Sequence, residues 1–197
     1  MIAIVEYEAG NVRSVVNALR RCGVAEWTLT SDSSILLLAD KVILPGVGDA
    51  SVALASLRSL GLDSVIPKLE CPVLGICVGM QIMCRHSDEG DAEGLGIFDA
   101  DVKRFKREVP EQKIPHMGWN QIKVIDDNPL LKGLDGKYVY FVHSYYCPKS
   151  KDASALTTYA GVEYVSVVRR GNASATQFHP ENSGNVGLEI LKNFGEL

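Results

Sequence analysis

Short apolar runs alternate with helix-like stretches through the first half of the chain. The apolar runs are IAIVEY, KVILPGV and PVLGIC, at residues 2–7, 41–47 and 72–77. Each is followed by a stretch whose apolar residues have helical spacing, at residues 10–23, 49–61 and 78–86. Strands without polar alternation are typical of parallel sheets that are buried on both faces. The first half therefore predicts a parallel sheet covered by helices.

The second half of the chain has a different pattern. Strand-like runs at residues 96–105, 120–125, 137–147, 155–161 and 164–170 are separated by short turns, and a last helix is expected at residues 185–194. A length of 197 residues suits one α/β domain better than two. We therefore expect one domain over residues 1–197, with a mixed, largely parallel central sheet flanked by helices and a flavodoxin-like core.

The composition is that of an ordinary globular protein. Hydrophobic residues make up 46% of the chain, and the net charge of −4 gives no reason to expect nucleic acid or an acidic membrane as a partner. The amino terminus lacks the basic start of a signal peptide, and the longest apolar run, SILLLAD, is too short to span a bilayer. Five cysteines without a CxxC pair favour reduced thiols and a cytoplasmic location.

Cys77 lies where a predicted strand ends and a helix begins, in the stretch GICVGMQ. Free amide groups at a helix start favour a thiolate, and they can donate to an oxyanion beside the sulfur. Gly75 and Gly79 leave room for backbone around a sharp turn, which is the geometry of a nucleophile elbow with cysteine in place of serine. The alternative is a structural cysteine with glycines that serve packing. The pattern alone leaves both open, because a nucleophile also needs a base.

His179 and Glu181, in the stretch TQFHPENS, are candidates for that base and its partner. Pro180 argues against a helix, and in an extended segment residues i and i+2 face the same side. A carboxylate placed there can hold the imidazole tautomer and support its positive charge. The alternative is a surface turn, which the HPE tripeptide alone would favour. A cysteine of elbow type in the same chain shifts the balance to a Cys-His-Glu triad.

Two other stretches allow more than one interpretation. LPGVGDAS nearly matches the GxGxxG pattern of dinucleotide sites, but Ser51 replaces the third glycine, so a nucleotide site is disfavoured. A glycine loop beside a nucleophile can instead turn amide groups toward a tetrahedral intermediate. IPHMGWN fits no periodic pattern, so Met117 and Trp119 could belong to the core or to an exposed partner surface.

GICVGMQ and FHPE resemble the two signatures of the class I glutamine amidotransferases, which hydrolyse the side-chain amide of glutamine and pass ammonia to a synthase. YEAGNVRS, LPGVGDA, PHMGWN and YFVHSYY resemble, more narrowly, the glutaminase subunits of imidazole glycerol phosphate synthase, from histidine biosynthesis. The resemblance runs the full length of the chain. It implies L-glutamine as the substrate, a heterodimer with a (β/α)₈ cyclase subunit, and no metal or organic cofactor. The cyclase products would be imidazole glycerol phosphate and an aminoimidazole carboxamide ribotide.

The resemblance also implies roles for individual residues. Cys77 would be the nucleophile, His179 the general base and acid, and Glu181 the residue that orients His179. The oxyanion hole would be formed by the amide of Val78 and by the loop of Gly46, Val47 and Gly48. Glutamine would be held by Gln81, Ser144 and Tyr145. The surface toward the cyclase and the ammonia exit would include Asn11, Met117, Trp119 and Tyr140.

The sequence departs from the family pattern after the HPE motif. Asn182 stands where the family commonly has lysine, which removes the cation that an interface ion pair at this position would need. Two other functions remain open from the sequence. One is the glutaminase of another pathway, such as pyridoxal phosphate or anthranilate synthesis, and the other is a non-catalytic flavodoxin-like binding module.

Overall fold

The computed structural model describes residues 1–106 and 113–197 of the chain. One sheet has a parallel part, in which the strands follow the order β2-β1-β3-β4-β14. These strands are β1 (Ile2–Val5), β2 (Trp27–Thr30), β3 (Lys41–Leu44), β4 (Val73–Ile76) and β14 (Ala173–Thr176). β1, β4 and β14 are buried along their whole length, as expected for strands that are covered on both faces.

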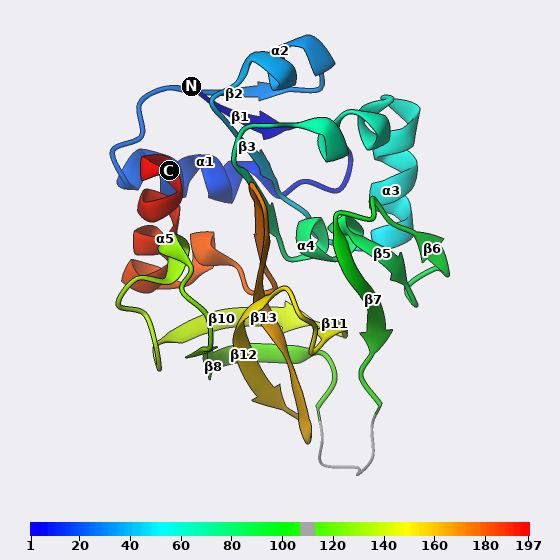
Figure 1. Cartoon of the computed structure of the whole chain (residues 1–197), viewed down its shortest axis with the longest axis vertical. Helices are drawn as coiled ribbons and strands as arrows, with labels where there is room; N and C mark the ends of the chain where they lie inside the picture. The colour runs from blue at the N-terminus through cyan, green and yellow to red at the C-terminus, as the bar shows by residue number, and fades with distance from the viewer. Residues whose placement is uncertain (107–112) are drawn as a thin grey trace.

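Helices lie on both sides of this parallel part (Figure 1). They are α1 (Val12–Arg21), α2 (Ser33–Leu38), α3 (Ala50–Ser59), α4 (Val78–Met83) and α5 (Gly184–Glu196). α1 packs against α5, and α3 packs against α4. The apolar spacing of α1 becomes its core face, because Val15, Val16 and Leu19 are buried. Within the described ranges, no helix is long and apolar enough to cross a membrane.

The same sheet continues from β14 into a largely antiparallel part. β13 pairs with β14, β12 and β11, and the sheet ends in β7, β5 and β6. The strands of this part are β5 (Cys84–Ser87), β6 (Ala92–Glu93), β7 (Phe98–Arg104), β9 (Lys123–Val124), β11 (Tyr145–Pro148), β12 (Ala153–Tyr159) and β13 (Val162–Arg170).

A separate two-stranded antiparallel sheet contains β8 (His116–Gln121) and β10 (Tyr138–His143). Its inner face is buried and includes His116, Phe141 and His143, whereas its outer face carries exposed side chains. Short 3₁₀-helices are η1 (Leu62–Ser64), η2 (Ile66–Lys68), η3 (Pro129–Leu131) and η4 (Pro180–Asn182). The β8–β10 sheet lies below α5 and beside β12 and β13 in Figure 1.

The predicted fold class is confirmed, since the structure has a mixed α/β fold with a largely parallel central sheet and flanking helices. Three predicted elements are wrong in detail. The strand expected over residues 120–125 is divided between β8 and β9, which belong to different sheets. The helix expected over residues 78–86 ends at Met83, because Cys84 has an extended ψ of 175° and begins β5. The strand expected over residues 137–147 is interrupted at Ser144, and its two halves, β10 and β11, belong to different sheets.

Candidate active site

A cavity of about 330 Å³ lies at the carboxyl end of β4. The segments that follow β3, β4 and β14 form one side, and the junction of β10 and β11 forms another. Ligands of open α/β sheets bind in this position, outside the carboxyl ends of the strands. The lining includes eight of the predicted site residues, which are Val47, Gly48, Cys77, Val78, Gln81, Ser144, Tyr145 and His179.

Cys77 is the single residue between β4 and α4, and its backbone is in an unusual conformation. Its φ is 53° and its ψ is −106°. Residues other than glycine rarely adopt a positive φ, which costs on the order of 1–3 kcal/mol and persists only where the surroundings hold it. The Cys77 amide donates a hydrogen bond to the carbonyl oxygen of Thr176 on β14 at 2.8 Å. The arrangement has the strand–turn–helix geometry of a nucleophile elbow.

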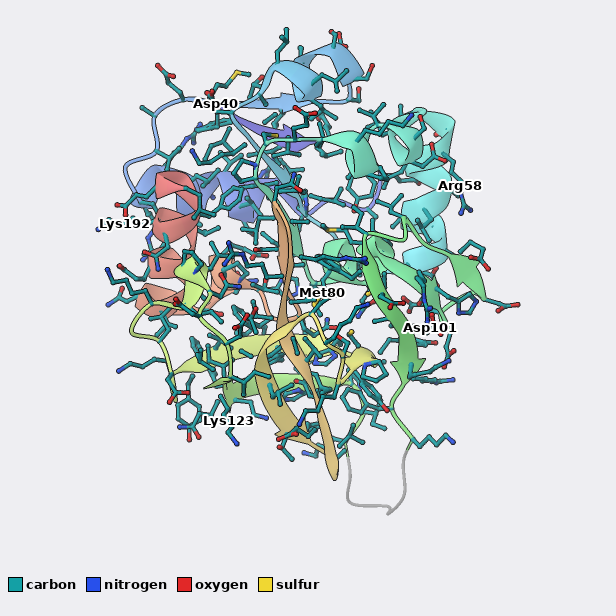
Figure 2. The ribbon with its side chains drawn as sticks, in the orientation of Figure 1. Asp40, Arg58, Met80, Asp101, Lys123 and Lys192 are labelled. Atoms are coloured by element: carbon teal, nitrogen blue, oxygen red, sulfur yellow. The ribbon has the colours of Figure 1, made fainter. Side chains whose placement is uncertain are left out.

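Two glycines permit the close packing around this turn. A Cβ at Gly79 would lie 2.0 Å from the carbonyl oxygen of Leu44, and a Cβ at Gly75 would lie 2.5 Å from Sδ of Met83. Every residue of α4 is buried, and Met80 lies in the interior of the molecule (Figure 2). The helix that follows Cys77 is therefore held on all sides, which keeps the sulfur in a fixed position.

His179 and Glu181 are paired. Nδ1 of His179 lies 2.8 Å from Oε1 of Glu181, and both side chains are buried. The predicted extended geometry is wrong, however, because residues Pro180–Asn182 form η4. Proline fits the first turn of a helix, where it has no hydrogen-bonded N–H to lose. His179 itself is extended, and the helical turn after it brings the Glu181 carboxylate back to the imidazole.

The charge on His179 depends on its two neighbours. Burial lowers the pKa of the imidazole, but the negative charges of Cys77 and Glu181, with the hydrogen bonds that they accept, outweigh burial and raise this pKa to about 10. His179 is therefore favoured as an imidazolium at neutral pH. Because Glu181 occupies Nδ1, Nε2 remains for the sulfur of Cys77.

A closed ring of hydrogen bonds holds the backbone of His179. Its amide donates to the carbonyl oxygen of Tyr140 at 3.0 Å, and the Tyr140 amide donates to Oγ of Ser183 at 2.9 Å. The Ser183 hydroxyl then donates to the carbonyl oxygen of His179 at 2.7 Å. The turn that carries the imidazole is thus attached directly to β10.

The loop of residues 45–48 lies against the Cys77 turn. The Val78 amide donates to the carbonyl oxygen of Gly46 at 3.3 Å, and the Val47 amide donates to the carbonyl oxygen of Ala9 at 2.7 Å. The Tyr7 hydroxyl donates to the carbonyl oxygen of Pro45 at 2.6 Å. The Val78 amide, which the resemblance assigned to the oxyanion hole, and the Val47 amide of the loop assigned to it are therefore both bonded to other protein groups in this arrangement.

Gln81, Ser144 and Tyr145, to which the resemblance assigned glutamine binding, lie together on the cavity wall. Nε2 of Gln81 donates to the carbonyl oxygen of Tyr145 at 3.0 Å and to Oε1 of Gln177 at 3.2 Å. These bonds connect α4 to the junction of β10 and β11, so one wall of the cavity is tied to the helix behind Cys77.

Sequence reasoning missed three polar residues at the site, which are Gln177, Glu89 and the cavity-lining His143. Gln177 is fully buried, and its Nε2 lies 3.8 Å from Sγ of Cys77. The TQFH segment could have indicated Gln177, because residues i and i+2 of an extended segment face the same side, and Gln177 is two residues before His179. Glu89 lines the cavity and accepts a hydrogen bond from the Ala50 amide at 2.9 Å. Burial raises the pKa of Glu89, and no sequence pattern marks this residue.

The residues predicted to face a partner lie mainly on the outer face of the β8–β10 sheet. Met117 is 63% exposed and Trp119 is 56% exposed, so their assignment to the core is excluded. Trp119 packs edge-on against the half-buried Tyr140, with ring centroids 6.1 Å apart. Asn11 is the residue before α1, a helix that packs against η4.

The remaining cysteines and potential metal ligands show no second centre among residues 1–106 and 113–197. All five cysteines are free thiols, and Cys77 alone among them has a positive φ. Over those ranges, no group of three or more His, Cys, Asp or Glu side chains is arranged to hold a metal ion.

Relatives of known sequence match the whole chain. Imidazole glycerol phosphate synthase subunit HisH of Bacteroides fragilis (strain YCH46) is 51% identical over 197 residues, which are 100% of this chain and 99% of that protein. The protein of the same name from Methanothermobacter thermautotrophicus is 44% identical over 200 residues, with 100% and 98% of the two chains covered.

Solved structures share the fold. A crystal structure of a glutamine amidotransferase is 19% identical, with a TM-score of 0.74 and 98% of each chain covered. The structure of PurLQS from Thermotoga maritima is 18% identical, with a TM-score of 0.73 and coverage of 99% of this chain and 97% of that one. The family model described as glutamine amidotransferase class-I matches residues 3–196. With this match and the full-length relatives, the chain belongs to the class-I glutamine amidotransferase family.

Proposed function

We propose that the chain hydrolyses L-glutamine to glutamate and ammonia, and that it delivers the ammonia to the (β/α)₈ cyclase subunit of imidazole glycerol phosphate synthase. The observation that carries the proposal is one cavity with Cys77 at an elbow beside the buried His179–Glu181 pair. The relatives named HisH, at 51% and 44% identity, support histidine biosynthesis over the other pathways left open by the sequence. Residues 1–197 act as one catalytic domain in this proposal.

The first half-reaction forms a thioester on Cys77. The thiolate attacks the amide carbon of glutamine, a C–S bond forms, and the carbonyl electron pair moves to the oxygen. When this tetrahedral intermediate collapses, the C–N bond breaks and Nε2 of His179 gives its proton to the leaving nitrogen. Ammonia departs as a neutral molecule, which is the nucleophilic form that an acceptor needs.

The second half-reaction releases glutamate. Neutral His179 takes a proton from water, and the oxygen attacks the thioester carbon. The C–S bond breaks, glutamate leaves, and the thiolate with its imidazolium is restored. Glu181 accepts from Nδ1 throughout, so it keeps the imidazole in one tautomer and supports its charge without exchanging protons with the substrate.

The cavity offers a group that suits the α-ammonium of glutamine and a wall along which the substrate fits. Glu89 lines the cavity and supplies a carboxylate for the α-ammonium group of the substrate. Gln81, Ser144 and Tyr145 form the wall along which the substrate would lie. The volume of about 330 Å³ is in the range of pockets that bind small molecules.

The outer face of the β8–β10 sheet is the proposed surface for the cyclase. Met117, Trp119 and Tyr138 are more than half exposed, at 63%, 56% and 57%. Methionine and aromatic side chains are enriched in the cores of protein interfaces, and exposed apolar side chains that gather on one face mark an interaction site. This face also carries Tyr140, whose backbone is bonded to that of His179. Asn182, an exposed residue of η4, which contacts β10, adds no charge to this surface.

Replacement of Cys77 by alanine tests the proposal. Without the nucleophile the thioester route is lost, so glutamate production should fall by several orders of magnitude while the fold is kept. Cys71→Ala is the matched control, because Cys71 is a partly exposed thiol just before the same strand. Glutamate release should be measured for both variants in the presence of the cyclase subunit. A Cys77→Ala variant with near-normal activity would refute the proposed mechanism.

A further inference from the structure

A chain of hydrogen bonds crosses the interior and ends at the cavity, where its last histidine, His143, is a lining residue. Nδ2 of Asn120 lies 3.4 Å from Nε2 of His116, and Nδ1 of His116 lies 2.9 Å from the Tyr164 hydroxyl. The same hydroxyl lies 3.2 Å from Nε2 of His143, whose Nδ1 lies 2.7 Å from the carbonyl oxygen of Tyr145. The chain begins on β8 and reaches the cavity wall through β13 and β10.

The direction of every bond in this chain is determined by its ends. A carbonyl oxygen can only accept, so Nδ1 of His143 carries the proton. In a neutral imidazole Nε2 must then accept, so the Tyr164 hydroxyl donates to it. That hydroxyl is left to accept from Nδ1 of His116, whose Nε2 accepts from the Asn120 amide. Both histidines are therefore Nδ1-protonated tautomers.

Burial keeps the two imidazoles neutral. It lowers the pKa of His143 to about 3 and that of His116 to about 4. Their rings are also fixed in orientation. The His116 ring is stacked between Phe141 and Tyr159, with centroid distances of 4.8 Å and 3.8 Å. A neutral chain held between aromatic rings has one low-energy arrangement, since reversal of any bond would leave a buried polar atom without a partner.

The carbonyl oxygen of Tyr145 is the end of the chain and a junction. It accepts from His143 at 2.7 Å and from Nε2 of Gln81 at 3.0 Å, so both of its lone pairs are used. Gln81 lies on α4, the helix that begins after Cys77. The two donors together fix the orientation of the Ser144–Tyr145 segment relative to the sulfur.

We propose that His116, Tyr164 and His143 are positioning residues for glutamine, because their hydrogen-bond chain sets the Ser144–Tyr145 wall against which the substrate binds. This inference rests on the proposed glutaminase function. It assigns a task to two buried histidines that take no part in the proton transfers of His179.

The tautomers provide a test that does not depend on activity. In the full-length, ¹⁵N-labelled chain at neutral pH, the imidazole ¹⁵N spectra of His116 and His143 should each show a protonated Nδ1 and an unprotonated Nε2. Protonated Nε2 on either residue would overturn the chain and the proposal with it. This result would leave the glutaminase function untouched.

Kinetics test the positioning role. Tyr164→Phe removes the hydroxyl that joins the two histidines. The KM for glutamine should rise about tenfold, which is the effect expected for one lost hydrogen bond, and kcat should change less than about twofold. Tyr159→Phe is the matched control, because it keeps the ring stacked on His116 and loses only a hydrogen bond to the carbonyl oxygen of Lys113. Both should be assayed in complex with the cyclase subunit. Equal KM values for the wild type and Tyr164→Phe would refute the positioning role.

A second pair of variants covers the case in which Tyr164→Phe does not fold. Asparagine places an amide N–H near the position of Nδ1, so His143→Asn keeps a donor for the Tyr145 carbonyl but loses the Nε2 that accepts from Tyr164. It should therefore raise KM about tenfold, as Tyr164→Phe does, and His143→Leu, which loses both bonds, should raise KM further. A wild-type KM in His143→Asn would contradict the proposal, whereas a wild-type complex without glutaminase activity would instead contradict the proposed function.

Discussion

The amide of Val78 donates its hydrogen bond to the carbonyl oxygen of Gly46, at 3.3 Å. An oxyanion that forms beside the Cys77 sulfur would need this amide, and in this arrangement the amide is already engaged. The Val47 amide is likewise engaged, by the carbonyl oxygen of Ala9. Rotation of the Gly46–Val47 peptide would withdraw the carbonyl from Val78 and turn the Val47 amide toward the cavity.

We therefore expect the isolated chain to be a poor glutaminase that its partner activates. One missing oxyanion donor lowers the rate roughly 10²–10³-fold, which is enough for a switch. Gly46 has no side chain to resist the rotation, and Gly48, with a φ of 88°, gives the loop a second flexible point. Glutamate production should rise from the isolated chain to the complex, and again when the cyclase binds its nucleotide ligand. Equal rates in all three states would show that no such switch operates.

His179 and Glu181 should differ in how strongly their replacement lowers activity. His179→Ala should be nearly as damaging as Cys77→Ala, because the imidazole serves in both half-reactions. Glu181→Gln keeps an oxygen that accepts from Nδ1 but loses the charge, so its loss of kcat should be roughly 10²-fold smaller. Glutamine hydrolysis by the two purified variants gives the comparison. If Glu181→Gln were the more severe, the assigned roles would be wrong.

Gln177 should contribute to the reactivity of Cys77. Its Nε2 donates to the sulfur at 3.8 Å, and its Oε1 accepts from Gln81. Gln177→Leu keeps the volume but removes both bonds, so kcat should fall about 10–100-fold, as expected for a lost hydrogen bond to a charged group. Iodoacetamide should also alkylate Cys77 more slowly in this variant. Gln121→Leu is the control, because its amide bonds only to the carbonyl oxygen of Gly136, away from the cavity. Unchanged alkylation and kcat in Gln177→Leu would exclude this contribution.

Much of the fold was predictable because, in the first half of the chain, the local sequence patterns agree with the final architecture. Apolar runs and helical spacing point to the same parallel architecture, and the elbow at Cys77 follows from the glycines that flank it. The pairing of His179 with Glu181 was also predictable, although the route was not. An extended chain and a 3₁₀ turn starting at a proline both bring these side chains together, and the tripeptide HPE does not distinguish the two.

The second half was less predictable because its elements depend on long-range pairing. The run at residues 137–147 contains no glycine or proline and reads as one strand. Its hydrogen bonds nevertheless go to β8 on one side of Ser144 and to β7 and β13 on the other. Next to this break, the Tyr145 carbonyl accepts from His143 on β10 and from Gln81 on α4. Nothing local to the sequence indicates that His116 and His143 face each other across β8 and β10.

The buried state of His143 should be visible in the pH dependence of stability. Burial lowers the pKa of His143 to about 3 in the folded protein, whereas an unfolded histidine titrates near pH 6.5. Between these values the unfolded chain binds a proton that the folded chain does not, so the free energy of unfolding rises with pH in this window. The stabilisation is complete above about pH 6.5 and is lost as the pH falls toward 3.

The contribution of this one histidine can be isolated by comparison. In the wild type it should add a slope of about 1.4 kcal/mol per pH unit between pH 4 and 6, and this slope should be missing from His143→Asn, because asparagine does not titrate. Urea unfolding of both proteins across this range measures the difference, in which the carboxylates common to the two proteins cancel. Parallel stability curves would mean that His143 keeps an ordinary pKa in the fold, and that the chain from His116 to Tyr145 is not neutral as its hydrogen bonds require.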